Sequence, residues 1–102
     1  MKAKEYKEAV KAYTRSLQLN PVEPFTFANR AMAYLKLKEF KNCLEDANKA
    51  IEIKPDYLKA FHRRGKALFS LHRYEEAIID FQFILEQEPH NEGVNKDLKD
   101  TR

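Results

Sequence analysis

A set of basic and amide residues in this chain has the types and the spacing that bind a carboxylate. Lys59 and Arg63 lie four residues apart, and Lys66 follows one helical turn later, so a helix would place them on one face. Asn29 lies 34 residues before Arg63, and Lys36 follows Asn29 by about two turns. Arginine binds a carboxylate through two parallel hydrogen bonds, whereas lysine supplies a mobile point charge. The set therefore predicts a surface that binds an acidic peptide.

The spacing of 34 residues recurs along the chain and predicts the elements that position these residues. Three prolines keep this spacing: Pro21, Pro55 and Pro89. Aromatic, small and aliphatic residues keep it too: Tyr6, Phe40 and Tyr74; Ala9, Cys43 and Ala77; Val10, Leu44 and Ile78; Leu17, Ile51 and Leu85. A unit of this length is typical of helical solenoids. We expect helices over residues 4–19, 25–37, 40–53, 58–71, 74–87 and 91–101.

The unit resembles the tetratricopeptide repeat (TPR). The family's marker positions fall on Phe27, Ala31, Tyr34, Cys43, Ala47, Ala50 and Pro55, and in the next unit on Phe61, Gly65, Leu68, Ala77, Phe81, Ile84 and Pro89. The resemblance implies an all-α fold, a right-handed superhelix of antiparallel helix pairs, with about two and a half repeats and a capping helix. The single domain, 1–102, would divide into half a repeat (1–23), two repeats (24–57 and 58–89) and the cap (90–102).

The first helix of the first repeat has no counterpart in the sequence. Counting back from the later units, that repeat would begin about eleven residues before Met1. The apolar stripe of helix 4–19 would then lack one neighbour: Tyr6, Val10, Tyr13 and Leu17. We interpret the chain as a fragment or a truncated domain, and self-association through this uncovered face is a hypothesis.

Two predicted helices supply the concave face, because the first helix of each stacked repeat lines it. The residues expected to face the groove are Phe25, Ala28, Asn29, Met32, Leu35 and Lys36, and then Lys59, His62, Arg63, Lys66, Phe69 and Ser70. None of these residues is acidic, so we expect the positive charge of the groove to be uncompensated. Met32 and Phe69 would contact an apolar residue of the bound peptide.

Two segments of the groove resemble those of the carboxylate-clamp TPR co-chaperones. Residues 29–37, NRAMAYLKL, resemble the second repeat of that family, and residues 59–65, KAFHRRG, resemble the third. In that family the clamp holds the C-terminal carboxylate and last aspartate of the EEVD tail of heat-shock chaperones. The resemblance implies that Asn29, Lys59 and Arg63 are three of five clamp residues and that Lys36 is a further peptide contact. The other two clamp residues would belong to the helix without a counterpart.

Other classes of function are disfavoured by the sequence. The net charge of +3 comes from alternating acids and bases, without the basic cluster typical of a nucleic-acid binder. No apolar run is long enough to span a membrane. Cys43 occupies a position that needs a small residue, and the three histidines lack a metal-ligand spacing. No nucleophile or phosphate-loop motif is present, so we expect no enzymatic activity, cofactor or metal.

A structural scaffold is the alternative to the carboxylate clamp. Such a solenoid would bind a different protein partner through another face, and the basic groove residues would be incidental. Binding that depends on a free C-terminal carboxylate would distinguish the clamp from the scaffold. The single cysteine fits a reducing compartment, so we expect the protein in the cytoplasm, with the nucleus as a second location.

Overall fold

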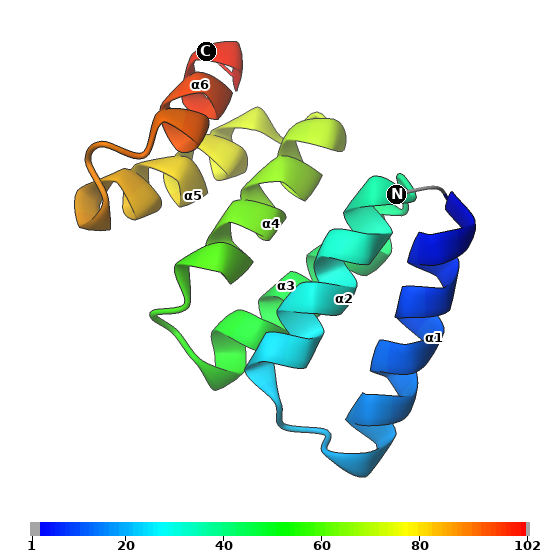
Figure 1. The fold of residues 1–102 in the computed structure, drawn as a ribbon. Coiled ribbons are helices and arrows are strands. Elements are labelled where there is room, and N and C mark those ends of the chain that lie inside the picture. The colour runs from blue at the N-terminus through cyan, green and yellow to red at the C-terminus, as the bar shows by residue number, and fades with distance from the viewer. Residues whose placement is uncertain (1–2, 102) are drawn as a thin grey trace.

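The computed structural model describes residues 3–101, which form a solenoid of helices in antiparallel pairs (Figure 1). The helices are α1 (Ala3–Leu19), α2 (Pro24–Lys36), α3 (Phe40–Ile53), α4 (Leu58–Ser70), α5 (Tyr74–Gln87) and α6 (Glu92–Thr101). Their bounds agree with the predicted ranges to within one residue. The described residues contain no strand, and the all-α solenoid predicted from the repeat is confirmed.

Side-chain caps mark where α2 and α6 begin. Glu23 caps α2, because its carboxylate accepts a hydrogen bond of 3.1 Å from the backbone N–H of Phe25. Pro24 occupies the first turn of α2, where its missing N–H removes no helical hydrogen bond. Asn91 has the same capping role for α6, since its Oδ1 accepts from the N–H of Val94 at 3.0 Å. These caps fix the starts of one groove helix and of the C-terminal helix.

The tight turn inside each complete repeat has the same backbone in both copies. Lys38 and His72, 34 residues apart, have positive φ angles of 61° and 62° just after α2 and α4. Each turn is closed by a backbone hydrogen bond that reaches back five residues, from Glu39 to Tyr34 at 2.9 Å and from Arg73 to Leu68 at 2.8 Å. The left-handed conformation usually favours glycine, so these hydrogen bonds hold two ordinary residues in a costly geometry.

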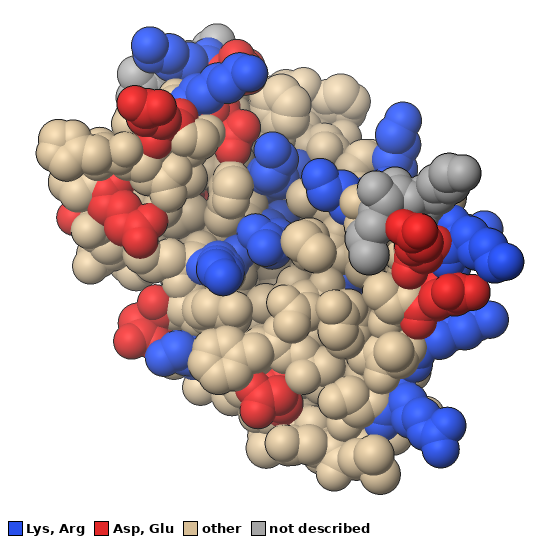
Figure 2. Space-filling view, viewed as in Figure 1, with Lys and Arg blue, Asp and Glu red and all other residues tan. Residues whose placement is uncertain are grey.

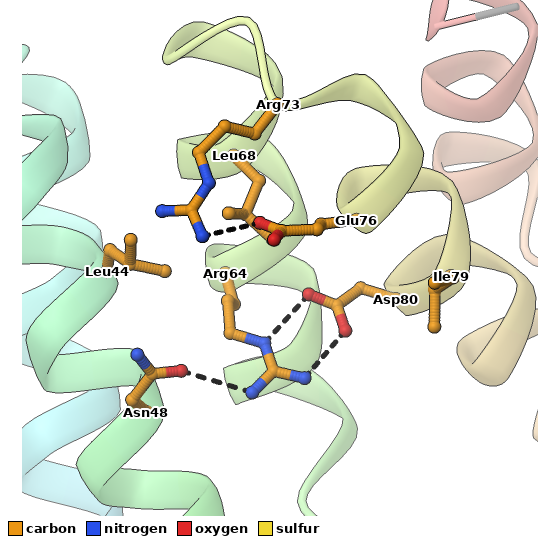
Figure 3. Close-up of a pocket in the computed structure, with 8 residues that line it drawn as sticks. All are labelled: Leu44, Asn48, Arg64, Leu68, Arg73, Glu76, Ile79 and Asp80. Atoms are coloured by element: carbon orange, nitrogen blue, oxygen red, sulfur yellow. Dashed lines mark hydrogen bonds and ion pairs between the residues drawn. The ribbon is translucent and has the colours of Figure 1, made fainter.

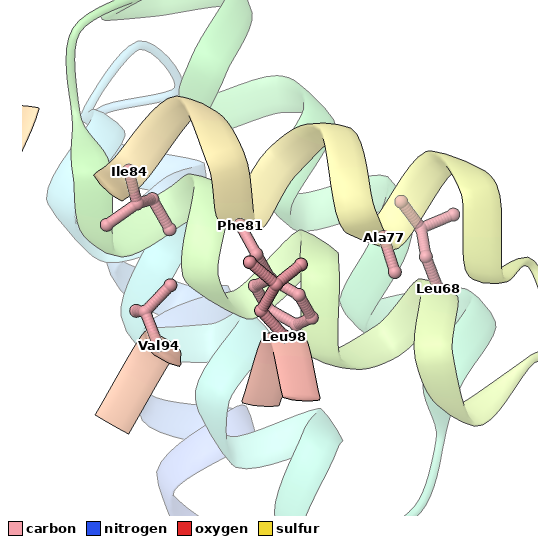
Figure 4. Packing of buried hydrophobic residues seen from close by; sticks show 6 residues of the cluster. All are labelled: Leu68, Ala77, Phe81, Ile84, Val94 and Leu98. Atoms are coloured by element: carbon pink, nitrogen blue, oxygen red, sulfur yellow. The ribbon is translucent and has the colours of Figure 1, made fainter. Parts of the chain in front are cut away.

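Small side chains allow the paired helices to approach closely. Ala31, Cys43, Ala47 and Ala67 are completely buried and form one cluster between α2, α3 and α4. The predicted role of Cys43 and Ala47 as small packing residues is therefore confirmed. At the C-terminal end, the helix contacts are made by larger side chains. Here α6 packs back on α4 and α5 through Val94 and Leu98 (Figure 4).

Helix α1 packs against α2 alone among the described helices. Ala12 and Ser16 are consequently exposed, whereas the residues 34 positions later, Asp46 and Ala50, are buried beneath α2. The stripe that the sequence predicted to lack a neighbour is instead half-buried at Tyr6, Val10 and Tyr13 and buried at Leu17. Self-association through α1 stays a prediction. Between residues 3 and 101, no helix is both long and apolar enough for a membrane span.

Candidate peptide-binding groove

The candidate groove lies where α2 and α4 pack side by side. In Figure 2, lysine and arginine side chains gather over these two helices, in the hollowed centre of the face, with acidic side chains at the α6 edge. The predicted site residues on α2 are Asn29, Met32 and Lys36, and those on α4 are Lys59, Arg63, Lys66 and Phe69. Asn29, Lys36 and Lys59 are exposed, so their polar groups are open to a ligand.

Arg63 is the most unusual member of this set, because its guanidinium is partly buried and lacks a carboxylate. Its Nε is buried without any hydrogen-bond partner. Its Nη2 approaches the sulfur of Met32 at 3.7 Å, which links α4 to α2. Burial lowers the pKa of Arg63, and the nearby Tyr57 and Cys43 only partly oppose this effect. No ion pair of Arg63 occurs within residues 3–101, so its charge is available to a ligand.

Two other arginines, Arg30 and Arg64, have the carboxylate partner that Arg63 lacks. Arg30 donates from Nε and Nη2 to the two carboxylate oxygens of Asp46 at 2.7 and 2.8 Å. Arg64 binds Asp80 in the same way at 2.8 and 2.7 Å, as Figure 3 shows. Each arginine also donates from Nη1 at 3.1 Å, to the hydroxyl of Thr14 and to the amide oxygen of Asn48 respectively.

These two polar networks were not predicted from the sequence. Their signal was available, because Arg30 and Arg64, Asp46 and Asp80, and Thr14 and Asn48 are all 34 residues apart. Both aspartates are buried, and each network joins three successive helices. The networks therefore connect neighbouring helices of the solenoid, and their arginines are not free to bind a ligand.

The two adjacent arginines of α4 thus have different roles. Successive residues of a helix point about 100° apart, so Arg63 faces the groove beside Met32 while Arg64 faces Asn48 and Asp80. The sequence assigned Arg63 and not Arg64 to the groove, but it did not predict the partners of Arg64. The structure leaves Arg63 as the arginine whose hydrogen-bonding capacity is unfilled.

The expectation that no acidic residue offsets the charge of the groove is wrong at one end. Asp97 of α6 contacts His62 through Oδ2, at 2.8 Å from Nε2, and pairs with Lys66 through Oδ1, at 3.6 Å from Nζ. The prediction considered only the first helices of the repeats, yet α6 takes the position of a further first helix. Asp97 follows Arg63 by 34 residues and so extends the same row. Lys66 is consequently less available to a ligand than Arg63.

A cavity of about 260 Å³ lies beside Asp97, between α4, α5 and α6. Its lining comprises Lys66, Phe69, Ser70, Phe81, Asp97 and Asp100. The ring of Phe81 is buried, whereas Phe69 is 36% exposed and packs its edge against Tyr74 at 5.5 Å between centroids. Phe69 therefore offers apolar surface at this end of the groove. The expected contacts of Met32 and Phe69 with a peptide stay predictions.

Cys43 has the environment of a packing residue. It is fully buried, and burial raises the pKa of its thiol to about 12. The thiol lies 3.7 Å from the backbone oxygen of Arg63, to which it donates a weak hydrogen bond. It is therefore protonated at neutral pH and is not a candidate nucleophile. Among the residues that the structure describes, no three histidine, cysteine or acidic side chains come together as a metal site.

Comparisons with known proteins give both a family and solved structures. The tetratricopeptide-repeat family model matches residues 24–57. The first TPR of Spaghetti (RPAP3), bound to the HSP90 peptide SRMEEVD, is 38% identical with a TM-score of 0.92, over 95% of this chain and 77% of that one. The TPR domain of Arabidopsis OM64 is 37% identical with a TM-score of 0.93, over 97% of this chain and 82% of that one.

A third similar structure is the second TPR domain of human RPAP3 in complex with the HSP70 peptide SGPTIEEVD. It is 36% identical with a TM-score of 0.89, over 94% of this chain and 80% of that one. None of the curated proteins matches the chain.

Proposed function

Because the chain belongs to the tetratricopeptide-repeat family, we propose that its basic groove binds the acidic C-terminal tail of another protein. The tail would be of the EEVD type found on heat-shock chaperones, and the chain would act as the docking module of a co-chaperone. Two similar structures, those of RPAP3 domains, contain peptides that end in EEVD. Repeat solenoids use their concave surfaces for such binding, without a catalytic step.

The observation that carries this proposal is the unpaired charge of Arg63. A partly buried guanidinium without a carboxylate partner is energetically unfavourable. The other two arginines of α2 and α4, Arg30 and Arg64, are each paired with a buried aspartate. A carboxylate from a ligand would supply the missing acceptor. Binding would then compensate a cost that is already present in the free protein.

The remaining residues have distinct roles in this proposal. Lys59, exposed one turn before Arg63, would supply a second positive charge to the terminal carboxylates. Asn29 would orient a carboxylate from α2, and Lys36 would contact the peptide further along the same helix. Met32, which already touches Arg63, would form part of the apolar floor. We propose a location in the cytoplasm, with the nucleus as a second one, because the single unpaired cysteine fits a reducing compartment.

Calorimetric titration with a free-acid EEVD peptide, compared with its C-terminally amidated form, tests this proposal. We expect the free acid to bind near micromolar Kd, about −8 kcal/mol, and amidation to remove most of this affinity. Arg63→Ala should weaken binding by about 1.5–3 kcal/mol, because it removes charge-assisted hydrogen bonds. Arg15→Ala is the matched control, since it removes the same charge from an exposed position on α1.

Equal affinity for the free acid and the amide would refute carboxylate binding. Such a result would favour a scaffold that binds its partner without recognising a chain end. Loss of binding in Arg63→Ala together with loss of helical circular dichroism would point to unfolding, so the spectrum of each variant is part of the measurement.

A further inference from the structure

The groove has opposite charge at its two ends. Lys59 and Arg63 lie at one end, and neither has an ion pair within the part of the chain that the structure describes. At the α6 end, Asp97 and Asp100 line the cavity of about 260 Å³ together with Lys66. A peptide that fits both ends must therefore change its own charge along its length.

The charges at the α6 end do not cancel. Both oxygens of Asp97 are engaged by the chain's own side chains, one with His62 and one with Lys66. Asp100 is exposed, and no ion pair holds it within residues 3–101. Among the charged residues that line the cavity, Lys66 and Asp97 neutralise each other, so Asp100 leaves the lining with one net negative charge.

The walls of the cavity favour a long basic side chain. Phe69 exposes its ring at the rim, and Phe81 forms part of the buried wall. The aliphatic stem of an arginine or lysine packs well on such a ring while its charged end reaches a carboxylate. An acidic side chain would instead meet Asp100 and would find the amine of Lys66 already paired with Asp97.

We propose that the cavity between α4 and α6 is a subsite for a basic residue of the bound peptide, upstream of its acidic C-terminus. This inference rests on the proposed function, because the carboxylate end of the peptide sets the register. Neighbouring helices lie about 8–10 Å apart, and Ser70 lies about 10 Å along α4 from Arg63. An extended chain covers this diagonal in about four to five residues. The basic residue is therefore the fifth or sixth from the free end.

Two heptapeptides that differ only at the sixth residue from the end test the subsite: SRMEEVD and SEMEEVD. The wild-type chain should bind the arginine peptide about three- to tenfold more tightly than the glutamate peptide. This range corresponds to replacing one solvent-exposed attraction between opposite charges by one repulsion between like charges. The preference should shrink as salt is raised from about 0.05 to 0.5 M, because both charges are exposed to solvent.

Asp100→Asn should reduce this preference to less than about twofold, since it removes the net negative charge of the cavity. Glu92→Gln is the matched control, because it removes one charge from the same helix at an exposed position outside the cavity lining. Asp97→Asn provides a second, opposite test. It frees Lys66, so the glutamate peptide should bind about two- to fivefold more tightly than it binds the wild-type chain.

The outcomes separate this inference from the proposed function. Equal affinity of the wild-type chain for both free-acid peptides would overturn the subsite and leave carboxylate binding intact. A preference that survives in Asp100→Asn would also overturn it. If neither free acid binds, or if amidation changes nothing, the proposed function fails and the subsite fails with it.

Discussion

Replacing Arg63 with methionine should make the fold more stable while it weakens peptide binding. The buried Nε of Arg63 has no hydrogen-bond partner, and such an unsatisfied group costs about 1–3 kcal/mol. Methionine has a similar length without the charge, and it can pack against Met32, which Arg63 already touches. We therefore expect Arg63→Met to raise the free energy of unfolding by about 1–3 kcal/mol.

Urea unfolding followed by circular dichroism measures this change, and thermal unfolding gives a second estimate. In a domain of this size, each kcal/mol corresponds to about 4–8 °C in Tm. The neighbouring substitution Arg64→Met is the matched control. It would leave the carboxylate of Asp80, 3% exposed, buried without its arginine, so we expect a loss of about 3–5 kcal/mol.

Two results would refute this reasoning. A loss of stability above about 1 kcal/mol in Arg63→Met would show that the arginine supports the fold in the way Arg64 does. Unchanged affinity of this variant for a free-acid peptide would show that the guanidinium does not bind the carboxylate. A gain in stability with a loss of binding would identify Arg63 as a residue kept for function at a cost in stability.

Three further changes probe the packing of the helices and the buried thiol. Gly65→Ala would place a Cβ 2.5 Å from Cε1 of the buried Phe81 ring. Although alanine has the better helix propensity, we expect the free energy of unfolding in urea to fall by about 1 kcal/mol. Gly93→Ala meets only Asn91 Oδ1 at 3.5 Å and should gain up to about 1 kcal/mol; a gain in both would contradict the close packing. Ala47→Leu should cost about 1–3 kcal/mol in the same assay, because its site is completely buried. Burial raises the pKa of Cys43 from 9.0 to about 12. Between pH 7 and 10.5, the free energy of unfolding of the wild-type chain should therefore fall by about 2 kcal/mol more than that of Cys43→Ala, as measured by urea unfolding at each pH. Equal losses would refute the buried thiol.

The sign of the pH effect follows from the two states of the thiol. In the unfolded chain the Cys43 thiol ionises near its ordinary pKa of 9.0, whereas in the folded chain it stays protonated up to about pH 12. The contribution of this group to stability is therefore complete below pH 9 and is lost as the pH rises toward 12.

The repeat explains why so much of the fold could be predicted. Helix bounds depend on local patterns, and each pattern occurs in register 34 residues later, so one copy supports the interpretation of the next. The small residues Ala47 and Cys43 could be assigned to the helix contacts for the same reason. The two residues with positive φ, Lys38 and His72, were not predicted, because neither is the glycine or asparagine that usually indicates this conformation.

The sequence by itself determined the period and the helices, and it predicted the row of polar residues that faces the groove. Only the tertiary structure decided which charges of that row are free. Whether an arginine is paired depends on a carboxylate from another helix, as Asp80 of α5 pairs with Arg64 of α4. Arg63, one residue earlier, points 100° away and meets none within residues 3–101. Asp97 reaches Lys66 because α6 packs back on α4, and helical periodicity carries no information about that contact.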